Sequence, residues 1–205
     1  MPDGVDPELF ALCEQFMRFS ANLLAAYLDA VAGISRIREQ VIQHQNDKIA
    51  ILKETEPAKA TEEFMDEQPV SHELEEQGES KPRRLLHRAT QRDFKRRTSP
   101  NGADTQFLGW MVITLLYGSW EDHYREKLAM ILGLKGKREL QHDLFGDLGQ
   151  LRHAILHNNG VATRDVEKAK ILKWFRRGEK IFISYDHADF LLDRIDSYVS
   201  QVCKA

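Results

Sequence analysis

Apolar residues recur at spacings of three, four and seven from about Asp6 to Lys53, and no other feature of this chain limits its fold so strongly. Two interleaved rows carry the pattern: Leu9, Phe16, Leu23, Ala30 and Ile37, and Leu12, Phe19, Ala26, Ile34 and Val41. Such spacing is typical of one long amphipathic helix with a seam like that of a bundle or coiled coil. Asp6-Pro7-Glu8 predicts its start. The aspartate can accept hydrogen bonds from the first turn, and the N–H that proline lacks would have no partner at this position. The pattern favours packing within the chain, and a seam between two chains is the alternative.

Further helices are predicted downstream. The first covers 104–134, with an apolar first half over 107–117, and the second covers 139–157. The second carries one clean apolar stripe and ends at Asn158-Asn159-Gly160, residues that tolerate the left-handed conformation. A shorter helix over about 163–175, a β-like run over 181–185 and a last helix capped by Asp186 complete the chain. These elements predict an all-α fold, an antiparallel bundle of four to five main helices.

A charged segment separates the first two long helices. Residues 54–79 hold ten acidic residues and one lysine, and the chain then reverses sign over 81–97. We interpret 54–104 as a charged, flexible insertion within a single helical domain over 1–205. The basic run offers candidate nucleic-acid contacts at Arg92, Lys95, Arg96 and Arg97. The favoured alternative is that it pairs with the acidic stretch before it.

Composition excludes several classes of protein. The chain has 205 residues and a net charge of −3, so no global basic field indicates a nucleic-acid binder. With 30% charged residues and no apolar run beyond 107–117, we expect no membrane association. Two cysteines, Cys13 and Cys203, cannot form a disulfide framework. The N-terminus does not resemble a signal peptide, and we expect a cytoplasmic protein.

The residues best suited to chemistry lie around the end of the helix over 139–157. They are Arg152, His153, His157, Asn158 and Asn159. On an ideal helix Arg152 and His157 are rotated by about 140° from each other, so they do not share a face. They converge only where the helix unwinds at His157, or where a second subunit completes the site.

Two readings of these residues need no resemblance to other proteins. His153 and His157 have the spacing of two zinc ligands on a helix, but Ala154 stands where a metalloprotease has its glutamate, and no third ligand follows. We therefore expect no metal and no cofactor. The second reading is structural, since Arg and His at the end of a helix cap its last carbonyls.

The third reading rests on a family. The phrase Arg152-His153-Ala-Ile-Leu-His157-Asn158, at the end of a helix, resembles the motif of the HEPN superfamily, an arginine and a polar residue followed by a histidine. The surrounding 143–158 and the upstream Gly118-Ser-Trp-Glu-Asp-His-Tyr-Arg125 are similar to stand-alone bacterial members. The resemblance is firm over about 106–162. It does not extend to the charged insertion.

The resemblance implies a helical homodimer in which two copies of the motif form one cleft. Many members are metal-independent endoribonucleases of toxin–antitoxin or antiviral systems, and others are inactive modules that bind protein or RNA. It therefore implies an RNA substrate, and an antitoxin of nucleotidyltransferase type is the candidate protein partner. It assigns catalysis to Arg152 as phosphate clamp and His157 as acid or base, with His153 and Asn158 as accessory residues.

Glu121 and Arg125 lie four residues apart on the helix before the motif. An ordinary ion pair along the helix is the favoured reading. In the functional alternative, Glu121 is an accessory residue that fixes Arg152 or His157, and Arg125 joins the candidate nucleic-acid contacts.

Overall fold

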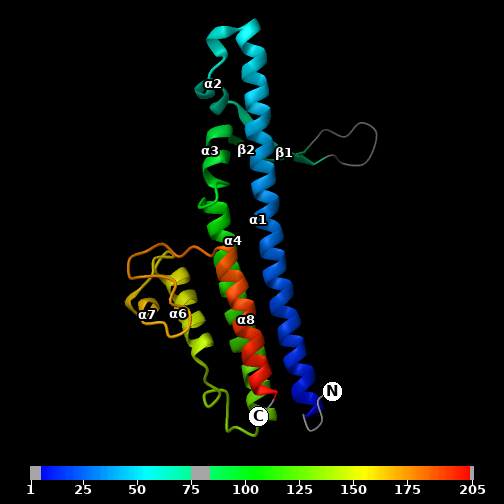
Figure 1. Cartoon of the computed structure of the whole chain (residues 1–205), viewed down its shortest axis with the longest axis vertical. Coiled ribbons are helices and arrows are strands. Elements are labelled where there is room, and N and C mark those ends of the chain that lie inside the picture. The colour runs from blue at the N-terminus through cyan, green and yellow to red at the C-terminus, as the bar shows by residue number, and fades with distance from the viewer. Residues whose placement is uncertain (1–5, 75–83, 204–205) are drawn as a thin grey trace. The chain divides into compact units, whose positions relative to one another are not determined.

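The computed structural model describes residues 6–74 and 84–203. The chain divides into two compact units, one formed by Met1–Ala30 with Gln106–Ala205 and the other by Val31–Thr105. Helix α1 (Pro7–Thr55) begins in the first unit and ends in the second (Figure 1). The second unit is thus larger than the expected insertion over 54–104, because it includes the second half of α1.

The all-α class is confirmed. After α1 the first unit contains α4 (Ala103–Ser119), the π-helical turn η2 (Trp120–Tyr124) and α5 (Arg125–Ile131). Helices α6 (Asp143–His157), α7 (Arg164–Glu167) and α8 (Tyr185–Val202) follow. The chain direction alternates from α1 to α4–α5, α6 and α8 (Figure 1). In the described part of the chain, no helix is both long and apolar enough to cross a membrane.

An aromatic cluster forms the centre of the first unit. Phe16 of α1 lies 5.5 Å from Trp120 and 5.9 Å from Phe145 of α6, between ring centroids. Trp120 stacks on Phe145 at 3.7 Å, and Tyr198 of α8 meets both rings edge-on. Four helical segments therefore share one core, and large buried aromatic surfaces of this kind dominate the energetics of packing.

The first part of α1 packs within the chain, as the favoured reading predicted. Asp6 caps the helix, since its Oδ1 accepts a hydrogen bond from the backbone N–H of Glu8 at 2.8 Å. The buried face differs from the predicted rows, and its members are Leu9, Cys13, Phe16, Ser20, Leu24 and Tyr27. A straight helix drifts by about 20° per heptad, so a row with strict spacing by seven leaves the core: Phe16 is still buried one heptad after Leu9, but Leu23 is only partly buried.

The predicted helix over 104–134 is interrupted by one wider turn. The backbone N–H of Arg125 bonds to the carbonyl of Trp120, five residues earlier. This turn allows both Trp120 and Tyr124 to be buried against Phe16. A single π-turn inside an α-helix shifts the register of the helix by one residue. A pattern of apolar residues at α-helical spacing therefore could not predict this π-turn.

The second unit is more ordered than a flexible insertion. Thr61 caps the short helix α2 (Glu62–Asp66), and Thr90 caps α3 (Gln91–Arg97). Strands β1 (Pro69–Leu74) and β2 (Arg84–Thr90) pair antiparallel between them. Residues 75–83, which the expected insertion also includes, lie outside the described part of the chain.

The segment between α6 and α8 corrects two predictions. The helix expected over 163–175 is only the single turn α7, and the β-like run over 181–185 forms no strand. Val161 and Lys180 make one isolated bridge instead, and Ile181 and Ile183 point into the core. Helix α8 then begins after Ser184, whose hydroxyl accepts from the backbone N–H of His187, rather than after Asp186.

Candidate functional site

The end of α6 has the structure that its sequence predicts. Leu144, Leu148, Leu151 and Ile155 are buried along one stripe, although the helix begins at Asp143 and Leu140 lies before it. The helix stays regular through His157, and the backbone N–H of Asn158 and that of Gly160 both bond to the carbonyl of Ala154. Asn159 and Gly160 have positive φ angles of 49° and 64°. This left-handed pair ends the helix where it was expected to end.

Gly160 also fixes the tip of α6 to α4. A Cβ at this position would lie 1.9 Å from Cζ2 of Trp110, so no other residue fits without displacing the indole. The Trp110 Nε1–H donates to the carbonyl of Ile181 at 2.9 Å. The tip is therefore held by a close contact between backbone and ring, and its position does not depend on the charged residues beside it.

Arg152 is half-buried between α6 and α4. Its guanidinium carbon lies 5.8 Å from the centre of the Tyr117 ring, and its Nε has no hydrogen-bond partner. A cation over an aromatic ring is held without being neutralised, so the charge stays available to an anion. The pKa of Tyr117 is raised, chiefly by burial and then by the carboxylate of Glu121. The phenol is therefore neutral at physiological pH.

His153 and His157 are both exposed on α6, and their ring centroids lie 4.8 Å apart. Neither they nor Arg152 bond to a helix-end carbonyl within the described residues. The carbonyl of Ala154 accepts backbone N–H groups instead, so the capping interpretation of Arg152 and His157 gains no hydrogen bond in its support among the described residues. Asn158 is indeed a hydrogen-bond donor, but it donates to the carbonyl of Val161 at 2.7 Å, within the turn.

Because α6 is regular through His157, Arg152 and His157 stay about 140° apart on the helix. The first route to convergence, an unwound last turn, is therefore closed in this structure. Only a second subunit is left to bring an arginine and a histidine of this motif together.

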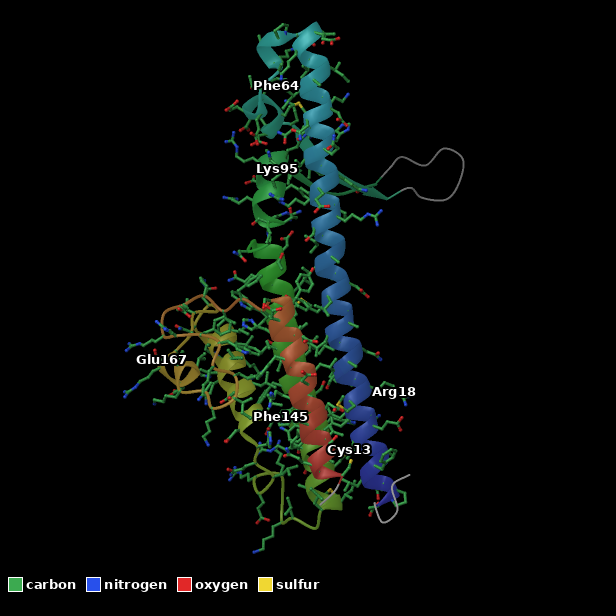
Figure 2. The ribbon with its side chains drawn as sticks, viewed as in Figure 1. Cys13, Arg18, Phe64, Lys95, Phe145 and Glu167 are labelled. Carbon is green, nitrogen blue, oxygen red and sulfur yellow. The ribbon has the colours of Figure 1, made fainter. Side chains whose placement is uncertain are left out.

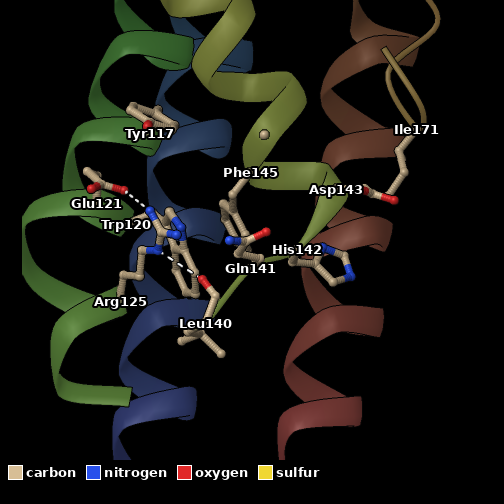
Figure 3. Close-up of a pocket in the computed structure, with 11 residues that line it drawn as sticks. Tyr117, Trp120, Glu121, Arg125, Leu140, Gln141, His142, Asp143, Phe145 and Ile171 are labelled. Carbon is tan, nitrogen blue, oxygen red and sulfur yellow. Dashed lines mark hydrogen bonds and ion pairs between the residues drawn. The ribbon is translucent and has the colours of Figure 1, made fainter. Parts of the chain in front are cut away.

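Glu121 and Arg125 belong to a different place. The Arg125 guanidinium donates to Glu121 at 2.7 Å and to the carbonyl of Leu140 at 2.9 Å (Figure 3). Lys137 lies 3.1 Å from the same Glu121 carboxylate. Burial alone would raise the pKa of Glu121, but the hydrogen bonds from Arg125 and Lys137 hold it below its usual value. The ordinary ion pair is confirmed, and no bond from Glu121 to Arg152 or His157 exists among the described residues.

Glu121, Arg125 and Leu140 line a cavity of about 480 Å³ at the start of α6, together with His142 and Phe145 (Figure 3). His157 lies at the other end of the same helix, about 20 Å from Asp143 at 1.5 Å per residue. Arg152 lies closer, because its guanidinium carbon is 5.8 Å from the centre of the Tyr117 ring, which also lines the cavity. Two nitrogens of Arg125, Nε and Nη1, are engaged inside this cavity, so its charge is compensated by Glu121. That Arg125 contacts nucleic acid stays a prediction.

Arg92 and Lys95 of the basic run pair with the acidic stretch, as the favoured alternative predicted, whereas Arg96 and Arg97 pair with carboxylates outside it. Lys95 of α3 (Figure 2) lies 2.6 Å from Asp66 and 3.0 Å from Glu62. Its Nζ also donates to the side chain of Gln45 in α1. Burial acts to raise the pKa of Asp66, but the bonds from Lys95 and Gln45 lower it overall. Arg92 pairs with Glu67, Arg96 with Asp93 and Arg97 with Asp104. The prediction that these four contact nucleic acid therefore loses its main basis, which was uncompensated charge.

One important residue near the site escaped sequence reasoning. Asp147 of α6 is buried, and its carboxylate accepts hydrogen bonds from the backbone N–H groups of Lys170, Ile171 and Leu172, at 2.6 to 3.0 Å. It fixes the loop after α7 to the body of α6. An acid on the buried side of an amphipathic helix was the available signal, since such a group needs partners.

Comparisons of this chain with protein-family models, with curated proteins and with solved structures find no match. Within the described residues, no group of three or more histidine, cysteine or acidic side chains is placed to hold a metal ion.

Proposed function

We propose that this protein is a homodimeric endoribonuclease of the HEPN type, with Arg152 and His157 as its catalytic residues, and that it acts in a toxin–antitoxin or antiviral system. The observation that carries the proposal is the state of the motif. Two exposed histidines lie one helical turn apart, beside an arginine whose charge no carboxylate neutralises among the described residues. These are the groups that the cleavage of a phosphodiester requires.

The reaction needs only the substrate and these side chains. The 2′-hydroxyl of a ribose attacks the adjacent phosphorus, the new O2′–P bond forms, and the bond from phosphorus to the 5′-oxygen breaks. One imidazole takes the hydroxyl proton, and a second one protonates the leaving oxygen. The arginine fork stabilises the charge that gathers on the phosphorane oxygens. The products are a cyclic 2′,3′-phosphate and a 5′-hydroxyl end.

A second copy of the chain supplies what one copy lacks. Arg152 and His157 do not share a face of α6, so the reaction is assigned to a cleft that two copies form. Exposed apolar side chains beside the motif support such an interface. Phe107, Met111 and Leu115 lie four residues apart on α4 and are 62%, 50% and 49% exposed, and Leu156 of α6 is 49% exposed. Helices α4 and α6 are neighbours, because Trp110 contacts Gly160 and Tyr117 contacts Gly149. A solvent-exposed apolar strip of this kind is typical of an interface.

The proposal is tested by incubating the purified protein with RNA in EDTA and analysing the ends of the fragments. We expect cyclic-phosphate ends. His157→Ala should slow cleavage by about 10²–10⁴-fold, and Arg152→Ala by about 10²–10³-fold, with unchanged circular dichroism. Gln150→Ala, an exposed position on the same helix, is the matched control and should cleave like the wild type. Cleavage that survives both Arg152→Ala and His157→Ala refutes the assignment. RNA left intact by the wild-type dimer favours instead an inactive HEPN module that binds protein or RNA.

A further inference from the structure

The segment that connects α7 to α8 carries a local excess of positive charge. Residues 164–180 include seven lysines and arginines and three acidic residues, in a chain whose net charge is −3. Most of this segment is irregular. Its end lies next to the motif, because the backbone N–H of Ile181 donates to the carbonyl of Gly160 at 2.8 Å.

The acidic residues of this segment are already engaged. The Glu179 carboxylate accepts from the backbone N–H of Arg176 at 2.8 Å, and that of Glu167 accepts from the backbone N–H of Arg177 at 3.4 Å. Asp165 pairs with Lys168 at 3.2 Å. The guanidinium groups of Arg164 and Arg177 thus have no carboxylate within ion-pair distance in the described part of the chain, and both side chains are exposed. A basic group that already pairs with a carboxylate, as Lys95 does, gains little free energy by binding a phosphate. The charges of Arg164 and Arg177 are not compensated in this way.

Both arginines line a hollow that begins at the motif. Its volume is about 440 Å³, and the lining consists of Asn158, Val161, Ala162, Thr163, Arg164, Arg177 and Gly178. Asn158 is the residue after His157. On the other side of the turn, the Nζ of Lys180 donates to the carbonyl of Asn159 at 3.0 Å and lies 6.0 Å from the centre of the Trp110 ring. The hollow thus begins one residue after His157, and its size falls in the usual range of ligand sites.

We propose that this hollow binds the sugar-phosphate backbone of single-stranded RNA next to the scissile bond, with Arg164 and Arg177 as phosphate contacts. This inference rests on the proposed function, because a scissile bond exists only if the protein cleaves RNA, and it names the substrate-binding surface of that site. The RNA contacts are therefore proposed in the segment over 164–180, and not in the basic run over 92–97, where carboxylates compensate the basic charges. Arginine forks match phosphate oxygens in a bidentate manner, and such contacts set the position of the strand without reading its sequence.

The test measures RNA binding separately from RNA cleavage. The probe is a fluorescein-labelled 2′-O-methyl RNA of about 12 nucleotides, which cannot be cleaved by its own 2′-oxygen. Its affinity for the wild-type protein and for Arg164→Gln/Arg177→Gln is measured by fluorescence anisotropy across a range of salt concentrations. The double variant Arg18→Gln/Arg194→Gln removes the same charge from two exposed arginines elsewhere in the first unit, and it is the matched control.

The slope of log K against log salt is negative, and we expect the site variant to make it shallower by about 1.4, because each phosphate contact of a single strand contributes about 0.7. If the two lines meet near 1 M salt, the loss of affinity at 0.1 M is about 25-fold. The control should keep the wild-type slope. A site variant with the wild-type slope, or a control that loses as much slope as the site variant, overturns the proposal.

A parallel cleavage assay separates this proposal from the proposed function. If the wild type cleaves RNA and Arg164→Gln/Arg177→Gln has an unchanged kcat/KM, the binding surface is wrong and the enzyme assignment stands. If the wild type binds the probe through these arginines without cleaving any RNA, the binding surface is right and the enzyme assignment is wrong.

Discussion

The rings of His153 and His157 lie 4.8 Å apart on the exposed side of α6, one turn from each other. This arrangement lasts only as long as α6 remains helical through His157. The left-handed turn at Asn159 and Gly160 and the contact of Gly160 with Trp110 both stabilise that last turn. The arrangement of the two histidines therefore depends on the stability of the glycine turn.

Gly160→Ala should destabilise the protein and slow cleavage together. The added Cβ meets the Trp110 ring at 1.9 Å, on a backbone with φ of 64° that alanine rarely adopts. Overpacking of this kind costs about 2 kcal/mol of unfolding free energy. Gly146→Ala is the matched control on the same helix. Its Cβ meets nothing within 4 Å, so better helix propensity should raise the free energy of unfolding by up to about 1 kcal/mol. Urea denaturation checks both values, and equal shifts of the same sign would contradict this account of the tip.

Met111→Lys/Leu115→Lys should convert a dimer into a monomer without unfolding it. Both side chains are about half exposed on α4, so lysine costs little in the monomer but introduces two buried charges in a dimer interface. Sedimentation velocity gives the oligomeric state, and loss of cleavage should accompany loss of the dimer. Met130→Lys, on α5, changes a side chain that is 71% exposed and serves as control. An interface elsewhere is indicated if the α4 variant sediments like the wild type.

Asp147→Ala should release the loop after α7. Three backbone N–H groups then lose their acceptor, and each buried unsatisfied donor costs about 1–3 kcal/mol. We expect a loss of about 3 kcal/mol or more in the free energy of unfolding, with faster amide exchange at residues 170–172. Asp189→Ala, an exposed aspartate of α8, should change neither quantity. Slow exchange at 170–172 in the Asp147 variant would show that other contacts hold this loop.

Acidification should weaken the start of α8. Burial holds the pKa of His187 below its usual value of 6.5, and its Nδ1 accepts the backbone N–H of Ser184 at 3.3 Å. Because the pKa of His187 is lower in the folded state, the stability that neutral His187 contributes is fully present above pH 6.5 and is lost as the pH falls through the folded pKa. His187→Gln keeps the capping box without a titrating group. Its free energy of unfolding should therefore match the wild type at pH 8 and fall less between pH 7 and 5. His142, whose pKa burial also lowers, accounts for the remaining fall.

The sequence predicted the long elements well, for local reasons. Asp6 and Pro7 at the start of α1, and Asn158 to Gly160 at the end of α6, act through the backbone next to them, and the structure confirms both. The apolar stripe of α6 is confirmed for the same reason, since residues one turn apart must share a face.

The sequence did not predict features that depend on distant partners. The helix expected over 163–175 ends early, since Asp147, more than twenty residues earlier in the chain, accepts the N–H groups that a helix would use. The acidic stretch gains order from Lys95, across the β1–β2 pair. For the candidate site, the residues were identifiable from their motif, but the partner of Arg152, the ring of Tyr117, was not. Glu121 pairs where its own helix places Arg125, as spacing by four predicts.

The central claim, that two copies of the motif make one site, is tested most directly by subunit mixing. Wild-type protein and His157→Ala are co-refolded at several ratios, and RNA cleavage in EDTA is measured at constant total concentration. If the one cleft needs the His157 of both subunits, the rate falls as the square of the wild-type fraction, to about one quarter at equal amounts. A rate that falls in direct proportion, to about one half, would contradict the account, because each active site would then use the His157 of one chain alone.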